Sequence, residues 1–206
     1  MMTKKQREIT SILLFIISVF MILSLVSHDP FETPGGIGGD IDINNWMGSS
    51  GVVISFICRQ LLLGIFSIVL PLCLLLFSYT LLTNKIDEKK YYYLMLYSLS
   101  IAFLFSSSFA LYYLWGGDVV DNTVVVQKSG LMAYATVGGL INLINKWFIL
   151  LLIVSSFIIV HISYFGWSLY DFSLIGFGLI NRFLHGLKKS VTSIWPKYIR
   201  KNIQPT

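Results

Sequence analysis

The amino-acid sequence predicts an all-α membrane protein with four transmembrane helices, interfacial amphipathic segments, and N- and C-termini in the cytoplasm. Only 12% of its residues are charged and 55% are hydrophobic, whereas a soluble domain carries about 25% charged residues. Four apolar runs are long enough to cross a bilayer, which takes about 20 residues. Twelve of the fifteen Lys and Arg residues fall in the three segments that this topology places inside, as the positive-inside rule requires.

The predicted first span, residues 9–27, follows a short basic segment with Lys4, Lys5 and Arg7. Its 19 residues carry no charge and, at 1.5 Å per residue, reach about 28 Å, which is enough for the hydrocarbon core. A basic start before an apolar run also resembles a secretory signal. However, this run exceeds the usual 7–15 residues of a signal core and no A-x-A site follows. We therefore predict an uncleaved span that begins in the cytoplasm.

The segment Ser27–Gly51 is the longest polar gap in the chain and contains no Lys or Arg. It carries four acidic residues and is interrupted by Pro and Gly. Because Lys and Arg are retained on the cytoplasmic side, an acidic loop between two apolar segments indicates the opposite side of the membrane. We place this loop, and the second loop 116–130, outside.

The apolar run that follows the first loop is longer than one span needs. We predict that residues 46–60 lie at the outer interface, with Trp46 as an aromatic anchor, and that residues 61–82 cross the membrane. Arg59 then snorkels to the boundary. The alternative is one tilted, continuous helix with Arg59 buried against a partner. Pro71 predicts a kink, because it lacks a backbone donor and its ring clashes with the preceding turn.

The lysine-rich connection 83–90 is predicted to be cytoplasmic. The third span, 91–115, has 25 residues without a charge. Tyrosine or tryptophan stands at both of its ends, where a spanning helix meets the two water interfaces. Five serines lie between these aromatic ends, and we interpret them as small residues for close helix packing, ahead of a polar pore lining.

The second outer loop leads into the fourth span. Val119–Val126 is rich in β-branched residues and predicts a short extended piece. Residues 131–145 resemble a second interfacial stretch, and Lys146 ends it at the interface. The span 147–167 follows, with His161 as its only His, Asp, Glu, Lys or Arg residue. We interpret His161 as packed or interfacial, because no acidic residue shares its span; the alternative is a proton path.

The chain thus divides into a membrane domain, residues 1–167, and a basic juxtamembrane tail, residues 168–206, which would also begin a linker. The tail predicts an amphipathic helix with apolar residues at i, i+3, i+4 and i+7, namely Ile180, Phe183, Leu184 and Leu187. The tail residues expected to contact anionic lipid or the aromatic interface are Arg182, Lys188, Lys189 and Trp195. A basic amphipathic helix next to a span binds the inner leaflet. DNA binding by the same cations is the alternative.

No residue pattern indicates an enzyme active site, a cofactor or a metal. The Gly-rich residues 35–40 lack the strand and helix of a phosphate-binding loop and fit no G-x-x-x-x-G-K-[ST] pattern. The three histidines lie in different segments, and none shares a helical face with Cys, Asp or Glu at metal-ligand spacing. Cys58 and Cys73 lie in apolar runs and are expected to be packed free thiols. We therefore expect no catalysis from this chain alone.

Two short motifs flank the acidic loop. The first span ends in Ser27, His28, Asp29 and Pro30, and the loop ends in Asn45, Trp46, Met47 and Gly48. After them come a Gly-rich apolar helix, a basic turn, a third span and a Gly-led fourth unit. This order resembles the N-terminal membrane domain of the FtsK/SpoIIIE DNA translocases, over about residues 7–167.

The resemblance implies an anchor in the bacterial inner membrane at the division septum, serving cell division and chromosome segregation. Its implied partners are the lipid bilayer, further copies of the chain in a hexamer, and division-site proteins. DNA would be bound only through a RecA-like ATPase motor domain, for which these 206 residues carry no Walker motif. The chain is therefore expected to be either a fragment or a stand-alone anchor.

Two other functions stay open on the sequence. One is a membrane scaffold that uses its basic tail to bind lipid. The other is a small transporter or channel subunit, which needs ionisable residues within the membrane. The candidates for that role are Arg59, Lys146 and His161.

Overall fold

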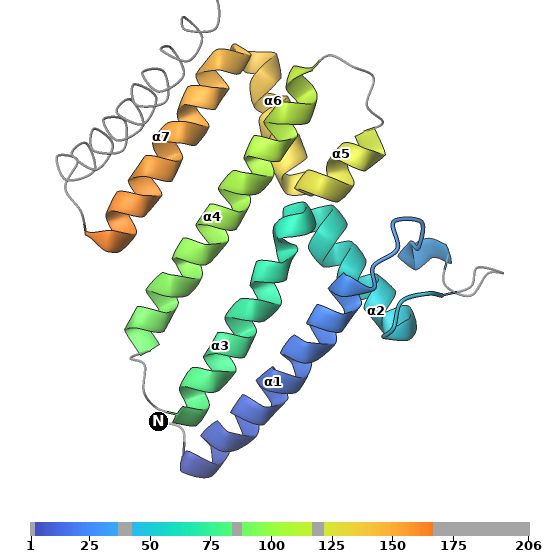
Figure 1. The fold of residues 1–206 in the computed structure, drawn as a ribbon, viewed down its shortest axis with the longest axis vertical. Helices are drawn as coiled ribbons and strands as arrows, with labels where there is room; N and C mark the ends of the chain where they lie inside the picture. The colour runs from blue at the N-terminus through green and yellow to red at the C-terminus, as the bar shows by residue number, and fades with distance from the viewer. Residues whose placement is uncertain (1–2, 37–42, 84–87, 117–121, 167–206) are drawn as a thin grey trace, which may run out of the picture. The chain divides into compact units, whose positions relative to one another are not determined.

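A computed structural model describes residues 3–36, 43–83, 88–116 and 122–166. All regular structure in these ranges is helical, as the sequence predicts, and Figure 1 shows its helices in chain order. The chain divides into two compact units, Met1–Tyr164 and Phe165–Thr206, and the described helices belong to the first, apart from the final residue of α7. The predicted tail helix lies outside the described residues, as do its expected lipid contacts Arg182, Lys188, Lys189 and Trp195.

Helix α1, Lys4–Val26, begins at a capping box. The hydroxyl of Thr3 accepts a hydrogen bond from the backbone N–H of Gln6, and the Gln6 side chain accepts one from the backbone of Thr3. At the other end the backbone N–H and the hydroxyl of Ser27 both donate to the Leu23 carbonyl. The helix therefore ends where the first sequence motif begins.

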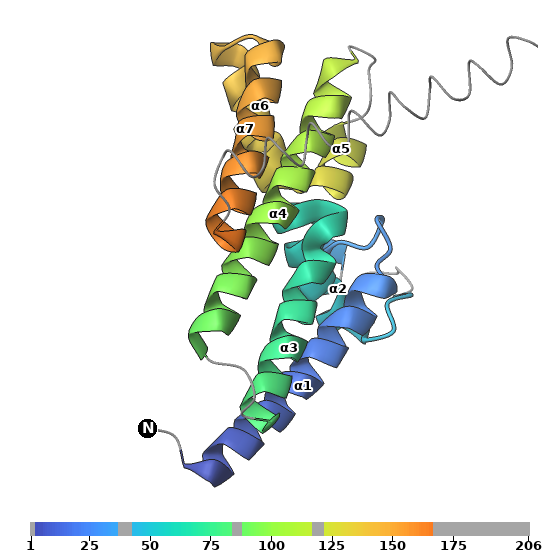
Figure 2. The same ribbon diagram turned by 60° about the vertical axis from the view of Figure 1, so that its left-hand side comes forward.

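Small serines bring α1 close to α3, Val69–Thr83, and the two helices lie side by side in Figures 1 and 2. Ser11 and Ser78 each donate to the other's backbone carbonyl, over 2.7 and 2.8 Å. Further along α1, Ser18 donates to the Pro71 carbonyl over 2.6 Å. Ser11 and Ser18 are fully buried. Such contacts hold helices together in a membrane, where apolar burial between helices gives little driving force.

The helical run into α3 is continuous but irregular. It begins with α2, Gly48–Ser55, continues as the π-helical η2, Phe56–Leu63, and tightens into the 3-10 turn η3, Gly64–Ile68. Arg59 thus lies within a helical segment and is half-buried. The chain changes from π-helix to 3-10 helix at Gly64, which has φ +61°.

Pro71 is the third residue of α3, which continues through it to Thr83. The break therefore precedes the proline. It lies at Gly64, which takes the left-handed conformation that glycine tolerates.

Helix α4, Glu88–Trp115, packs along α3 and over the break before it. Ser106 is fully buried and donates to the Leu63 carbonyl over 2.6 Å, which confirms the packing role expected of the serines for this one residue. Tyr91 differs from its expected interfacial position. It is buried, its hydroxyl donates to the Cys73 carbonyl, and its ring stacks on Phe77, whereas its two neighbours in sequence are exposed. Cys58 and Cys73 are buried free thiols, as predicted.

Two short helices precede the last span. Helix α5, Asn122–Ser129, and helix α6, Leu131–Leu143, meet at Gly130 with a bend of 117°, so the pair is a broken span or a re-entrant loop. The expected extended conformation of Val119–Val126 is wrong for its part in α5. There Val125 is 2% exposed, and packing against α4, α6 and the π-helical segment overrides the strand preference of valine.

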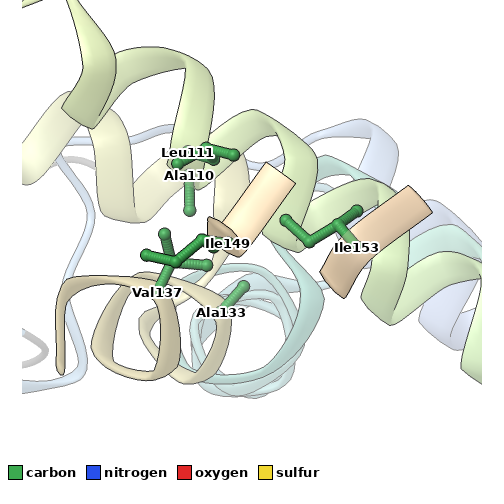
Figure 3. Close-up of a cluster of buried hydrophobic side chains, with 6 residues drawn as sticks. All are labelled: Ala110, Leu111, Ala133, Val137, Ile149 and Ile153. Carbon is green, nitrogen blue, oxygen red and sulfur yellow. The ribbon is translucent and has the colours of Figure 1, made fainter. Parts of the chain in front are cut away.

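Helix α7, Lys146–Phe165, closes a core shared with α4 and α6 (Figure 3). Small and branched side chains from these three helices meet there: Ala110, Leu111, Ala133, Val137, Ile149 and Ile153. His161 lies further along α7, and its Nδ1 is 3.0 Å from the Tyr97 hydroxyl of α4, as expected for a packed histidine.

The described helices include four that are long and apolar enough to cross a membrane, or up to five if the bent α5–α6 pair counts as one. The four candidate spans are Lys4–Val26, Gly48–Thr83, Lys89–Trp115 and Lys146–Phe165. Large apolar side chains on α1 and α7 remain about half exposed, which is the surface expected of helices that contact lipid.

Candidate functional site

The two sequence motifs that flank the acidic loop lie against each other. The first follows α1, the second precedes α2, and these two helices are in contact. The backbone N–H of Trp46 donates to the Ser27 hydroxyl over 3.0 Å. Residues 24–32 and 44–55 therefore form one hydrogen-bonded unit, which we call the outer latch.

Asn45 is the central residue of the outer latch and is only 4% exposed. Its side-chain N–H donates to the Ser24 carbonyl over 3.0 Å, and its side-chain oxygen accepts from the Met47 backbone over 3.1 Å. Its own carbonyl accepts from the Gly48 backbone over 2.8 Å, in the turn that begins α2. A Cβ on Gly51 would overlap the Asn45 side chain, so this close approach requires glycine there.

Two acidic residues order the turn after α1. One oxygen of Asp29 accepts from the backbone N–H of Phe31 over 2.9 Å, and the other lies 3.5 Å from the side-chain nitrogen of Asn44. Glu32 is 5% exposed, and one of its oxygens accepts from the Asn44 backbone. These carboxylates therefore replace hydrogen bonds that an irregular backbone lacks.

His28 joins the turn to α2, because its Nδ1 lies 3.1 Å from the Ser55 hydroxyl. Burial lowers the pKa of His28 from its usual value, the charge of Arg59 adds to this effect, and Asp29 and Glu32 oppose it. This environment favours the neutral form of His28. Its Nε2 and one oxygen of Glu32 are buried and have no hydrogen-bond partner among the described residues.

The other motif residues lie at the edge of the outer latch. Pro30 is exposed, and its carbonyl is 3.5 Å from the side-chain nitrogen of Gln127 in α5. Trp46 is 66% exposed, so its ring is free to contact lipid, as an aromatic anchor requires. Gly48 has φ +63°, a conformation that favours glycine at the start of α2.

The two described cations expected at the interface lie at different places. Arg59 lies in η2 and contributes positive charge near His28 in the outer latch. Lys146 is the first residue of α7, and its ammonium donates to the carbonyl of Trp115, the last residue of α4, over 3.4 Å. The structure therefore brings Trp46 and Arg59 to the outer latch and Lys146 to the α4–α7 junction.

Sequence reasoning missed several residues that complete the outer latch. These are Ser24, Glu32, Asn44 and Ser55. The sequence signal for Asn44 was the Asn pair before Trp46, which follows an acidic turn. Asn and Asp side chains commonly form hydrogen bonds with backbone groups in turns. Ser24 and Ser55 had no such signal, since serines within apolar runs are ordinary packing residues.

Comparison with known proteins places these features in a family. The family described as the 4TM region of DNA translocase FtsK/SpoIIIE matches residues 3–175. This range contains both motifs of the outer latch and all four candidate spans. No curated protein and no solved structure matches the chain significantly.

Proposed function

Because the chain belongs to the FtsK/SpoIIIE four-transmembrane family, we propose that it is the inner-membrane anchor of an FtsK-like DNA translocase that acts in cell division and chromosome segregation. The chain is a multi-pass membrane protein, and the matched family is a membrane region rather than a catalytic one. Its proposed place is the division septum, and its proposed partners are division-site proteins and further copies of itself. DNA contact would belong to the RecA-like motor domain that the family resemblance implies.

The outer latch is the observation that carries this proposal. Hydrogen bonds tie the end of α1 to the start of α2, and serine contacts tie α1 to α3. The two described ends of the outer loop are thereby held on the spans. An anchor needs such a rigid connection, because it must couple contacts made by the outer loop to a motor domain on the cytoplasmic side of the membrane.

The ionisable residues favour an anchor over a transporter. Lys146 bonds to the end of α4, and His161 bonds to Tyr97. Arg59 lies near the outer latch. Lys146 and His161 thus make structural contacts, whereas a transporter uses ionisable residues along a polar route.

A fluorescent fusion at Thr206, expressed in dividing bacteria, tests the proposal. The expected result is a band at midcell. Uniform membrane fluorescence from a fusion that inserts correctly would contradict the septal role and favour the transporter. The substitutions Arg59→Leu and Lys146→Leu provide a second test, because an anchor keeps its insertion and midcell position in both.

A graft tests the anchor role directly. Residues 1–206 replace the membrane region of a translocase that retains its own motor. The expected result is recovery of midcell recruitment and of chromosome segregation. Recruitment without segregation would limit the role to cell division, and failure of both, with normal insertion, would contradict the proposal.

A further inference from the structure

A pocket of about 660 Å³ lies between the end of α4 and the start of α7. Its walls are mostly apolar and include Leu111 and Ile153 of the shared core together with Leu150, Trp115 and Trp147. This volume falls within the range of about 300–1,000 Å³ typical of ligand pockets. A pocket with such walls binds an apolar chain in preference to a polar metabolite.

The position of the pocket determines what reaches it. Both of its helices are candidate spans, and the pocket lies at the end of α4 and the start of α7, where a span meets the surface of the bilayer. Trp115 and Trp147 pack edge to face with their ring centroids 4.7 Å apart, and Tyr112 beside them is 74% exposed. Trp and Tyr side chains are enriched at head-group level. The acyl chain of a membrane lipid is therefore the apolar group available to this pocket.

Two lysines bond to residues that line the pocket. Lys146 donates to the carbonyl of Trp115, and Lys128 donates to the hydroxyl of Tyr113 over 2.9 Å, with its ammonium 5.4 Å from the centre of that ring. Tyr113 and Trp115 both line the pocket. An ammonium group has three donors, so each lysine keeps N–H groups for an anionic oxygen.

We propose that this pocket binds one acyl chain of an anionic phospholipid, whose phosphate lies against Lys128 and Lys146. These are the two lysines that the sequence places on the outer side of the membrane, and both bond to residues of the pocket. The charge near the opening selects an anionic head group, and the apolar walls hold the chain. The site does not depend on the proposed anchor function.

Native mass spectrometry of the full chain, purified with equal amounts of phosphatidylglycerol and phosphatidylethanolamine carrying the same acyl chains, tests this site. We expect one phosphatidylglycerol per chain to be retained in preference to phosphatidylethanolamine. Each lysine near the head group should contribute about fivefold to that preference. Lys128→Gln with Lys146→Gln should therefore remove the preference without abolishing lipid retention.

Filling the pocket separates it from the general lipid surface. Leu150→Trp should reduce retention of both lipids severalfold, whereas Leu96→Trp, at a similarly exposed position of α4 outside the pocket, should not. Helical content by circular dichroism checks that both variants fold. Equal retention of the two lipids by the native chain overturns the proposal. It is also overturned if Leu150→Trp leaves retention unchanged or alters only the mass of the oligomer, since a second copy of the chain would then be the occupant.

Discussion

Gly64 and Gly130 meet backbone to backbone. A Cβ on Gly130 would lie 2.7 Å from the nitrogen of Gly64, and a Cβ on Gly64 would overlap the Lys128 carbonyl. Both glycines have positive φ, +61° and +77°. Gly64 ends the π-helical segment before α3, and Gly130 joins α5 to α6. The irregular helical segment before α3 thus packs directly against the bend between α5 and α6.

Gly64→Ala and Gly130→Ala should each destabilise the fold by about 2–4 kcal/mol. An alanine there takes a left-handed conformation, and its Cβ meets main chain that has no room to move. Unfolding in mixed detergent micelles measures the change. Gly139→Ala is the matched control, because it lies within α6 with open space around it, and it should be neutral or stabilising by up to about 1 kcal/mol. Equal effects at all three positions would contradict this role.

The four spans could be predicted from the sequence, because apolar length and the distribution of Lys and Arg are properties of the chain alone. The place of the helix break could not. The polar pair Arg59–Gln60 suggested a boundary after residue 60, whereas the conformation changes at Gly64, which depends on contact with Gly130. A single glycine within an apolar run was the local signal for that break.

Asn45→Ala should destabilise the outer latch by about 1–3 kcal/mol. The substitution leaves the buried Ser24 carbonyl and the Met47 N–H without their side-chain partners. Asn44→Ala is the matched control. Its side chain is exposed and its main contact to the Glu32 carboxylate uses the backbone, so the change should stay within about 0.5 kcal/mol. If the two alanine variants unfold alike, the central role of Asn45 is wrong.

The residues of the outer latch could be identified from the sequence only in part, and their contacts could not. Ser27 and Trp46 could be identified from their motifs, but their hydrogen bond joins segments separated by the acidic loop. The burial of Glu32 and the contact between His28 and Ser55 arise only once α1 and α2 pack. Residue types were therefore readable from the sequence, whereas their pairing was a result of tertiary structure.

The fold should lose stability as the pH falls below about 6.5, the usual pKa of histidine. Burial lowers the pKa of His28 in the folded protein, so between pH 6.5 and that lowered value the unfolded chain binds a proton more readily. The free energy of unfolding then decreases as pH falls through this window and levels off below it. Unfolding measured from pH 7.5 to pH 5 should show this slope, and His28→Gln should reduce it. An unchanged slope in the variant would assign the effect to other groups.

The reciprocal bonds between Ser11 and Ser78 should be energetically coupled. Ser11→Ala and Ser78→Ala each remove a hydroxyl that donates to the opposite backbone, and each should cost about 0.5–1.5 kcal/mol. The coupling between them, from a double-mutant cycle in micelles, should be about 0.6 kcal/mol, as for other hydrogen bonds between membrane helices.

A larger side chain at the same contact should have a greater effect. Ser11 is fully buried against α3, so Ser11→Leu forces the helices apart and should cost about 1–3 kcal/mol. Ser155 of α7 provides the control, because its hydroxyl bonds to Leu152 within its own helix and is not buried between helices. Ser155→Leu should therefore be close to neutral. Similar losses at positions 11 and 155 would mean that the serines of α1 do not set the distance between α1 and α3.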